Sequence, residues 1–189
     1  MKMIHDRIKC GEFFKYIPNW QDKQFCQCGK IESIEHILLK CEVNHQNKLW
    51  KKVGKVWEKI TGTKWISLEI NDVMAIGCLK VDEKKIKKNR KLKAEVLITL
   101  ITTAIWSIWK NRNERIFNEQ VETEDKQVKS WKESLRNEIK MEFIIAQQKP
   151  LGEKNKSLKR FIKKWSSENK VVRVSEKKSN GKRKVKINL

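Results

Sequence analysis

Apolar residues recur at helical spacing over most of the chain. Between Leu49 and Ile60 they stand three or four residues apart, which predicts a short helix that Thr61-Gly62-Thr63 ends. A long helix is predicted from Ala94 to about Asn118, apolar almost all round in its first half, as suits a helix buried between others. Another is predicted from Glu124 to Gln148. The linker between these two is short, so we expect them to lie antiparallel.

Two stretches are harder to assign from the pattern. The segment from Trp65 to Leu79 fits either an extended piece or a short helix. Pro150 and Gly152 mark a boundary, beyond which one short amphipathic helix is predicted. Its apolar positions are Leu158, Phe161, Ile162 and Trp165. The end of the chain, 171–189, is expected to be disordered on its own.

The first half of the long helix could be mistaken for a membrane span. Val96 to Trp109 is strongly apolar, but the stretch is about fourteen residues long and a span needs about twenty. Hydroxyl side chains also interrupt it, so we interpret it as a buried core helix and expect no membrane partner. The chain starts without the apolar run of a secretory signal. We therefore expect an intracellular, reducing and nuclear location.

Positive charge is the strongest global feature. The net charge is +21, an excess that is normally offset by a polyanion. Nucleic acid, either RNA or DNA, is the expected partner, and an anionic membrane surface is the alternative. The basic stretches lack the large apolar face of a membrane-binding helix, which favours nucleic acid. One candidate phosphate-binding patch is Lys84, Lys85, Lys87, Lys88, Arg90, Lys91 and Lys93, and the other is Lys159, Arg160, Lys163, Lys164, Lys182, Arg183 and Lys184.

A cluster of cysteines near the N-terminus has the composition of a metal site. Cys26, Cys28, His36 and Cys41 form the pattern C-x-C-x7-H-x4-C. Three thiols and one imidazole supply a complete tetrahedral set for Zn²⁺ with no open position, as in structural sites. The C-x-C pair is shorter than usual, and cysteines also serve as small buried apolar residues. Unmetallated core cysteines are therefore the alternative.

The residues between these ligands indicate how the segment folds. Gly29 suits a tight turn after the first cysteine pair, and Ser33 can cap a helix that carries His36. On an ideal helix, His36 and Cys41 would lie about 140° apart. Cys41 must therefore lie where the helix ends or tightens.

These elements predict a mainly α protein. We expect a small zinc knuckle, then a helical bundle or hairpin, then a basic, partly disordered tail. The corresponding ranges are 1–50, 51–148 and 149–189. The last range holds fifteen Lys or Arg against three Glu.

Two stretches resemble a known family. From Cys26 to Cys41 the chain is similar to the zinc-binding region that follows the polymerase domain in non-LTR (LINE-type) retrotransposon reverse transcriptases. The run Trp106-x-x-Trp109-Lys110-x-Arg112-Asn113-x-x-x-Phe117 resembles a helix that those polyproteins carry downstream of the knuckle. Gly11-Glu12-Phe13-Phe14 also fits, so the resemblance covers roughly 5–120.

The resemblance implies specific roles. Cys26, Cys28, His36 and Cys41 would bind zinc, and Trp106, Trp109, Arg112 and Asn113 would shape a helix of the same module. In the family this region is thought to assist binding of the element's RNA or target DNA, beside a polymerase domain. The chain has no acidic Asp-Asp polymerase pair and no ribonuclease H domain. It looks like a C-terminal remnant of such an element, or an open reading frame derived from one.

Nucleic-acid binding without catalysis is the leading hypothesis. Trp165, between basic residues, either stacks on a base or packs in the core. The second hypothesis is a protein-interaction scaffold, in which zinc only stabilises the helices and apolar residues around Trp106 face a partner. Catalysis by a Cys nucleophile is not expected, because the closed site uses His36 and all three clustered cysteines.

Overall fold

The fold is mainly helical in the computed structural model, which describes residues 8–41, 43, 45–78, 89–119, 123–166, 171–176 and 183–189. The principal elements are α1 (Gln46–Thr61), α2 (Ile70–Met74), α3 (Arg90–Asn118), α4 (Glu124–Gln148), α5 (Leu151–Trp165), β1 (Val172–Glu176) and β2 (Arg183–Ile187). Short 3-10 turns span Gly11–Phe14, Gln21–Gln24 and Ile76–Cys78, and a π-helix spans His36–Lys40. The predicted order of a cysteine-rich knuckle before a helical region is confirmed.

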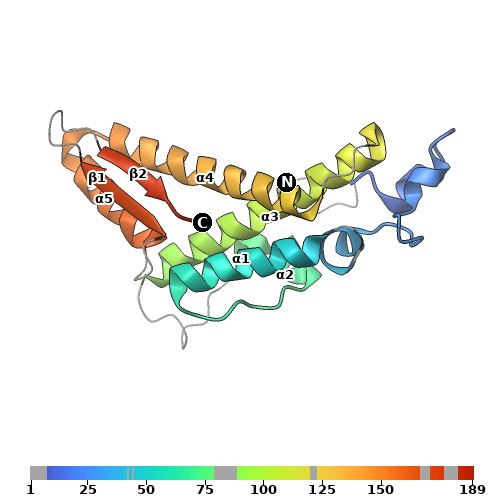
Figure 1. Cartoon of the computed structure of the whole chain (residues 1–189), viewed down its shortest axis with the longest axis horizontal. Helices are drawn as coiled ribbons and strands as arrows, with labels where there is room; N and C mark the ends of the chain where they lie inside the picture. The colour runs from blue at the N-terminus through green and yellow to red at the C-terminus, as the bar shows by residue number, and fades with distance from the viewer. Residues whose placement is uncertain are drawn as a thin grey trace.

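Helix α3 is the central element of the molecule (Figure 1). It contacts α1, α4, α5 and the π-helix of the knuckle. Its first half is apolar on nearly every side because neighbours cover most of it: Val96, Leu100, Ile101 and Ala104 are fully buried. The helix starts at Arg90, four residues before the predicted start.

Helices α3 and α4 form the predicted antiparallel pair (Figure 1). The apolar stripe of α4 is buried, and Trp131 donates a hydrogen bond from Nε1 to Thr103 Oγ1 at 3.1 Å. Thr123 caps the start of α4 by accepting from the Lys126 amide. The stretch from Trp65 onward resolves into an extended piece followed by the short helix α2.

The C-terminal tail is more ordered than predicted. Residues 151–165 form the expected amphipathic helix α5, but β1 and β2 then pair as an antiparallel hairpin, with Val174 opposite Val185. Val171 and Val172 are buried, and the hairpin contacts α4 and α5. The expectation of disorder is therefore wrong for the described part of 171–189. The alternation of polar and apolar residues along β2 is a strand pattern, which the basic composition had masked.

Lys93 joins the ends of two helices from inside the protein. Its Nζ donates to the Lys164 carbonyl at 2.9 Å and lies 3.4 Å from the Ile60 carbonyl, so it faces the last turns of α5 and α1. Positive charge is favoured beside these carbonyl ends. Burial lowers the pKa of the Lys93 ammonium to about 8.

The buried lysine predicts a pH-dependent stability. Between pH 8 and about 10.4 the unfolded chain holds a proton on Lys93 that the folded chain has released, so the free energy of unfolding should rise with pH. Urea denaturation of the wild type and of Lys93→Met at several pH values isolates the contribution of the Lys93 proton to stability, because the two proteins share all other titrating groups. We expect the wild type to gain stability relative to the variant across this window. If the difference in free energy of unfolding between the two proteins stayed constant with pH, folding would not lower the pKa of Lys93.

Candidate metal centre

A tight turn places the first two cysteines. Phe25 and Ile31 pair as an antiparallel bridge, and the Cys26 amide donates to the Lys30 carbonyl at 2.8 Å. Gly29 closes the turn by donating to the Cys26 carbonyl and has a φ of +81°. That left-handed conformation favours glycine, as the sequence predicts.

A capped, widened helical turn places the other two ligands. Ser33 Oγ accepts from the His36 amide at 3.0 Å, which confirms the predicted cap. The segment His36–Lys40 is a π-helix, and the Cys41 amide donates to the His36 carbonyl at 2.9 Å. This i→i+5 bond brings Cys41 back beside His36. Cys41 does lie where the helix ends, but the turn widens rather than tightens.

The four ligand atoms form one compact cluster. They all lie within 4.8 Å of one another. Cys26 Sγ is 3.4 Å from Cys41 Sγ, and Cys28 Sγ is 3.3 Å from His36 Nε2. A tetrahedral zinc ion would hold two sulfurs about 3.8 Å apart, and a sulfur and a nitrogen about 3.5 Å apart. The cluster therefore has the size and donor set to hold a single metal ion.

Burial and hydrogen bonds tune the protonation of these ligands. Burial raises the pKa of the Cys26 thiol to about 12, whereas the backbone amide of Lys30 lowers the pKa of the partly exposed Cys28. Burial also lowers the pKa of His36, which favours the neutral imidazole that binds a metal. A bound cation would displace the remaining thiol protons.

The other described cysteines and His45 lie outside the cluster, and His5 lies outside the described residues. Cys10 is partly buried and Cys78 is exposed. His45 is 3.1 Å from the Glu124 carboxylate, which Lys48 also contacts at 2.9 Å. These contacts tie the segment after the knuckle to the start of α4.

A buried ion pair joins the cluster to α3. Arg112 donates from Nε to the Glu32 carboxylate at 3.0 Å, and both side chains are almost fully buried. Arg112 also donates to the Lys9 carbonyl at 3.3 Å, and Arg115 lies 3.6 Å from the second Glu32 oxygen. Sequence analysis assigned Arg112 only to a helix of the same module and gave Glu32 no role. A glutamate between metal ligands gives no sign that its partner is eighty residues away.

The N-terminal turn packs against the same pair. Gly11 has a φ of +54°, and a Cβ there would lie 2.0 Å from the Glu32 carbonyl, so only glycine fits. Phe14 is fully buried, with its ring 5.8 Å from the Arg112 guanidinium and 6.3 Å from the Phe117 ring. The three stretches that carry the family resemblance therefore meet in one unit.

Part of the predicted phosphate-binding set is exposed. Arg90, Lys91, Lys159, Arg160, Lys163 and Lys184 are exposed, and Arg183 is partly so. Lys84, Lys85, Lys87, Lys88 and Lys182 lie outside the described residues.

Two predicted phosphate contacts are wrong. Lys93 is buried against carbonyl groups, as described above. Lys164 is also buried, and its Nζ lies 3.0 Å from the Glu142 carboxylate. Trp165 packs in the core and donates to the same carboxylate at 2.7 Å, so it is not a stacking residue. One face of α5 is turned inward, which a count of charges does not reveal.

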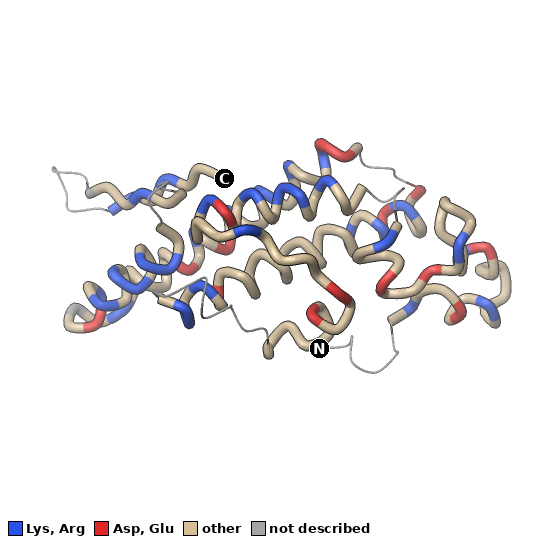
Figure 2. The backbone as a smooth tube through the Cα atoms, turned by 90° about the horizontal axis from the view of Figure 1, so that it is seen from below, with Lys and Arg blue, Asp and Glu red and all other residues tan. Residues whose placement is uncertain are grey.

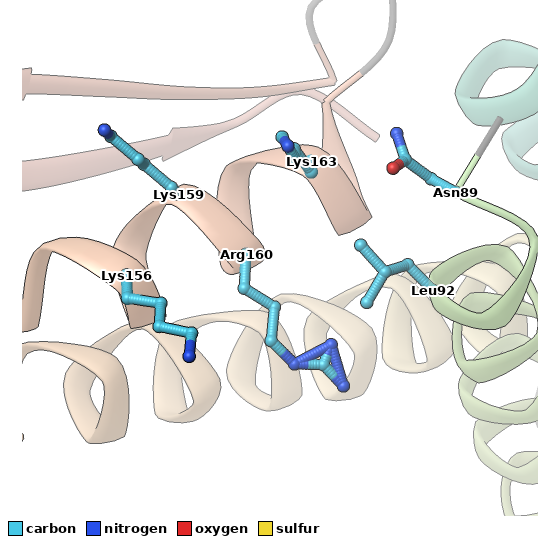
Figure 3. Close-up of a pocket in the computed structure, with 6 residues that line it drawn as sticks. All are labelled: Asn89, Leu92, Lys156, Lys159, Arg160 and Lys163. Atoms are coloured by element: carbon cyan, nitrogen blue, oxygen red, sulfur yellow. The ribbon is translucent and has the colours of Figure 1, made fainter. Parts of the chain in front are cut away.

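The exposed side of α5 lines an open groove of about 470 Å³. Lys156, Lys159, Arg160 and Lys163 come from α5, and Asn89 and Leu92 come from the start of α3 (Figure 3). Arg160 is partly neutralised by Glu95 at 2.6 Å. Figure 2 shows basic residues along α5 and the hairpin, where acidic residues are sparse. Sequence analysis missed Lys156, although it continues the helical spacing of Lys159 and Lys163.

Helix α3 has the length and composition of a membrane span, with a mean hydropathy of 1.4 in its most apolar window. Half of that window is buried inside the protein. Core helices share this composition, and α3 packs against three other long helices.

Comparison with known proteins adds no relative. No protein-family model, curated protein or solved structure matches the chain.

Removing one ligand should abolish metal binding. Cys41→Ser leaves three donors and an open position, so we expect native mass spectrometry to show one zinc per chain in the wild type and none in the variant. Cys10→Ser and Cys78→Ser are matched controls and should retain the metal. A chelator should unfold the knuckle, because a segment with so few core residues gains folding energy from the ion. An unchanged metal content in Cys41→Ser would contradict the assignment.

Breaking the buried pair should be costly. Arg112→Met leaves the Glu32 carboxylate without its main partner, and we expect a loss of about 3–5 kcal/mol in the free energy of unfolding. Adding Glu32→Leu should recover much of this loss, because the double variant buries no charge. The exposed Arg160–Glu95 pair is the control: Arg160→Met should cost about 1 kcal/mol or less. Equal effects at the two arginines would contradict a structural role for Glu32–Arg112.

Proposed function

We propose that the protein is a zinc-stabilised helical module that binds RNA or DNA and has no catalytic activity. The support for zinc is the donor set: three sulfurs and one nitrogen, mostly buried, with all four positions filled by protein. Such a closed shell leaves no coordination site for a substrate, so the metal would have a structural role.

The groove beside α5 is the observation that carries nucleic-acid binding. Its four basic side chains line one groove and point in different directions (Figure 3). Lysine and arginine side chains are common partners of backbone phosphates. Helix α5 carries six basic residues and one acid. Their ammonium and guanidinium groups would contact phosphates without reading the bases.

The resemblance to the reverse transcriptase zinc-binding region supports the same proposal. Its quoted stretches pack on one another through Glu32, Arg112 and Phe14. In this proposal the chain works beside nucleic acid in the nucleus, with a polymerase domain as a second partner.

A protein-interaction scaffold is the second candidate function. Trp106 on α3 is 62% exposed, and the outer face of α4 carries exposed Met141, Ile144 and Ile145. Apolar groups of this kind are typical of protein contacts. In that case self-association should be insensitive to salt.

A salt titration distinguishes these functions. If Lys156, Lys159 and Lys163 each contact a phosphate of duplex DNA, changing all three to Gln should flatten the slope of log affinity against log salt by about 2.7, at about 0.9 per contact. Exposed Lys126, Lys129 and Lys140 on α4 provide a control of equal charge. The control triple variant should keep the slope, and both should keep the metal. No binding by the wild type at about 50 mM salt would refute the nucleic-acid proposal.

A further inference from the structure

The N-terminal segment lies at the opposite end of the protein from α5 (Figure 1), and partly exposed aromatic rings gather there. Phe13, Trp20 and Phe117 are each 39 to 44% exposed, although their ring centroids lie within 6.3 Å of buried Phe14. Tyr16, two residues after Phe14, is 81% exposed. We call Phe13, Tyr16, Trp20 and Phe117 the aromatic surface.

A lysine accompanies each of these rings. Lys9 Nζ lies 5.8 Å from the Phe13 centroid, and Lys15 Nζ lies 5.6 Å from the Tyr16 centroid. Lys23 Nζ lies 5.4 Å from Trp20 and 5.6 Å from Phe117. Lys23 also donates to the Ile116 carbonyl at 2.9 Å, which fixes its position and leaves two of its three protons for another acceptor.

The packing of the fold accounts for only part of this arrangement. Phe14 is fully buried beside the Arg112 guanidinium, which also lies 5.9 Å from the Phe117 ring, whereas the outer rings remain 39 to 81% exposed. Between residues 8 and 31 four lysines outnumber two acids, Glu12 and Asp22. Exposed rings with lysine ammonium groups close to them match a ligand that alternates flat aromatic groups with negative charges.

Single-stranded nucleic acid has that chemistry. Proteins that hold single strands stack bases on aromatic side chains and contact the phosphates with cations. The α5 groove differs, because no aromatic side chain is among the described residues that line it. A protein partner would have to bury three ammonium groups with the rings, which is costly unless they are paired.

We propose that the aromatic surface stacks unpaired bases of a single strand while Lys9, Lys15 and Lys23 contact its phosphates. This inference deepens the proposed nucleic-acid function and rests on it. The two surfaces then differ in ligand: the α5 groove takes the backbone of any strand or duplex, and the aromatic surface requires unpaired bases.

The test compares a normal strand with one that lacks bases. Fluorescence anisotropy would be measured with short labelled oligo-dT, oligo-U and an abasic strand of equal length and charge. Tyr16→Leu and Phe13→Leu remove stacking faces but keep apolar bulk. Each should weaken binding of the normal strands about fivefold or more. Neither should change binding of the abasic strand or of duplex DNA. Relative affinities for oligo-dT and oligo-U distinguish DNA from RNA.

Trp106→Leu is the matched control, since it removes an exposed ring from a different surface. It should leave all affinities unchanged. Metal content and thermal unfolding midpoints should equal those of the wild type in every variant. Tyr16 in particular is 81% exposed, so its replacement removes little buried contact. Photocrosslinking of a 5-bromouracil strand should label the peptide that contains Phe13 to Trp20.

The outcomes separate the two proposals. If Tyr16→Leu and Phe13→Leu bind the normal strands as tightly as the wild type, the aromatic surface is not a base-stacking site, whereas the α5 variants can still weaken binding. If these variants instead abolish self-association without changing affinity for the strands, the surface is a protein interface and the inference is overturned. If the wild type binds no oligonucleotide, the proposed function fails, and this inference fails with it.

Discussion

The buried ion pair between Glu32 and Arg112 joins the knuckle to helix α3. A metal ion could hold Cys26 to Cys41 together, but it would not fasten that short loop to the helices. Arg112 does so by donating to Glu32 and to the Lys9 carbonyl, with Phe14 packed over it. Burying two charges costs desolvation energy, so the net stabilisation by such a pair is small, whereas removing one partner leaves the other charge buried and uncompensated. Gly11 allows the N-terminal turn to approach closely enough to complete this contact.

Local patterns predicted the parts of the fold that depend on neighbours in sequence. The bounds of α4, the Ser33 cap and the Gly29 turn follow from spacing and residue type alone. The four-residue metal cluster could also be predicted, because its ligands lie within one short segment. The widened turn at His36 could not, since a π-helix has no distinct sequence signal.

The errors about the predicted phosphate contacts and Trp165 concern contacts between distant segments. Lys93 and Lys164 read as solvent-exposed in a charge run, but the ends of α1 and α5 converge around the first, and Glu142 pairs with the second. Trp165 looked available for stacking because its sequence neighbours are basic, whereas α4 covers it. The exposed rings were missed for the same reason. Trp20 and Phe117 are far apart in sequence, but their centroids lie 5.6 Å apart in the structure.

The knuckle and α5 lie toward opposite ends of one helical body (Figure 1). The cysteine cluster and the aromatic surface therefore lie toward one end, and the basic groove lies at the other. We propose that a zinc ion in the Cys26, Cys28, His36 and Cys41 site organises the knuckle end. X-ray absorption spectroscopy at the zinc edge of the purified full chain tests this most directly. We expect three sulfurs at about 2.3 Å and one nitrogen at about 2.0 Å. A shell of oxygen and nitrogen only, or protein that folds without zinc, would contradict it.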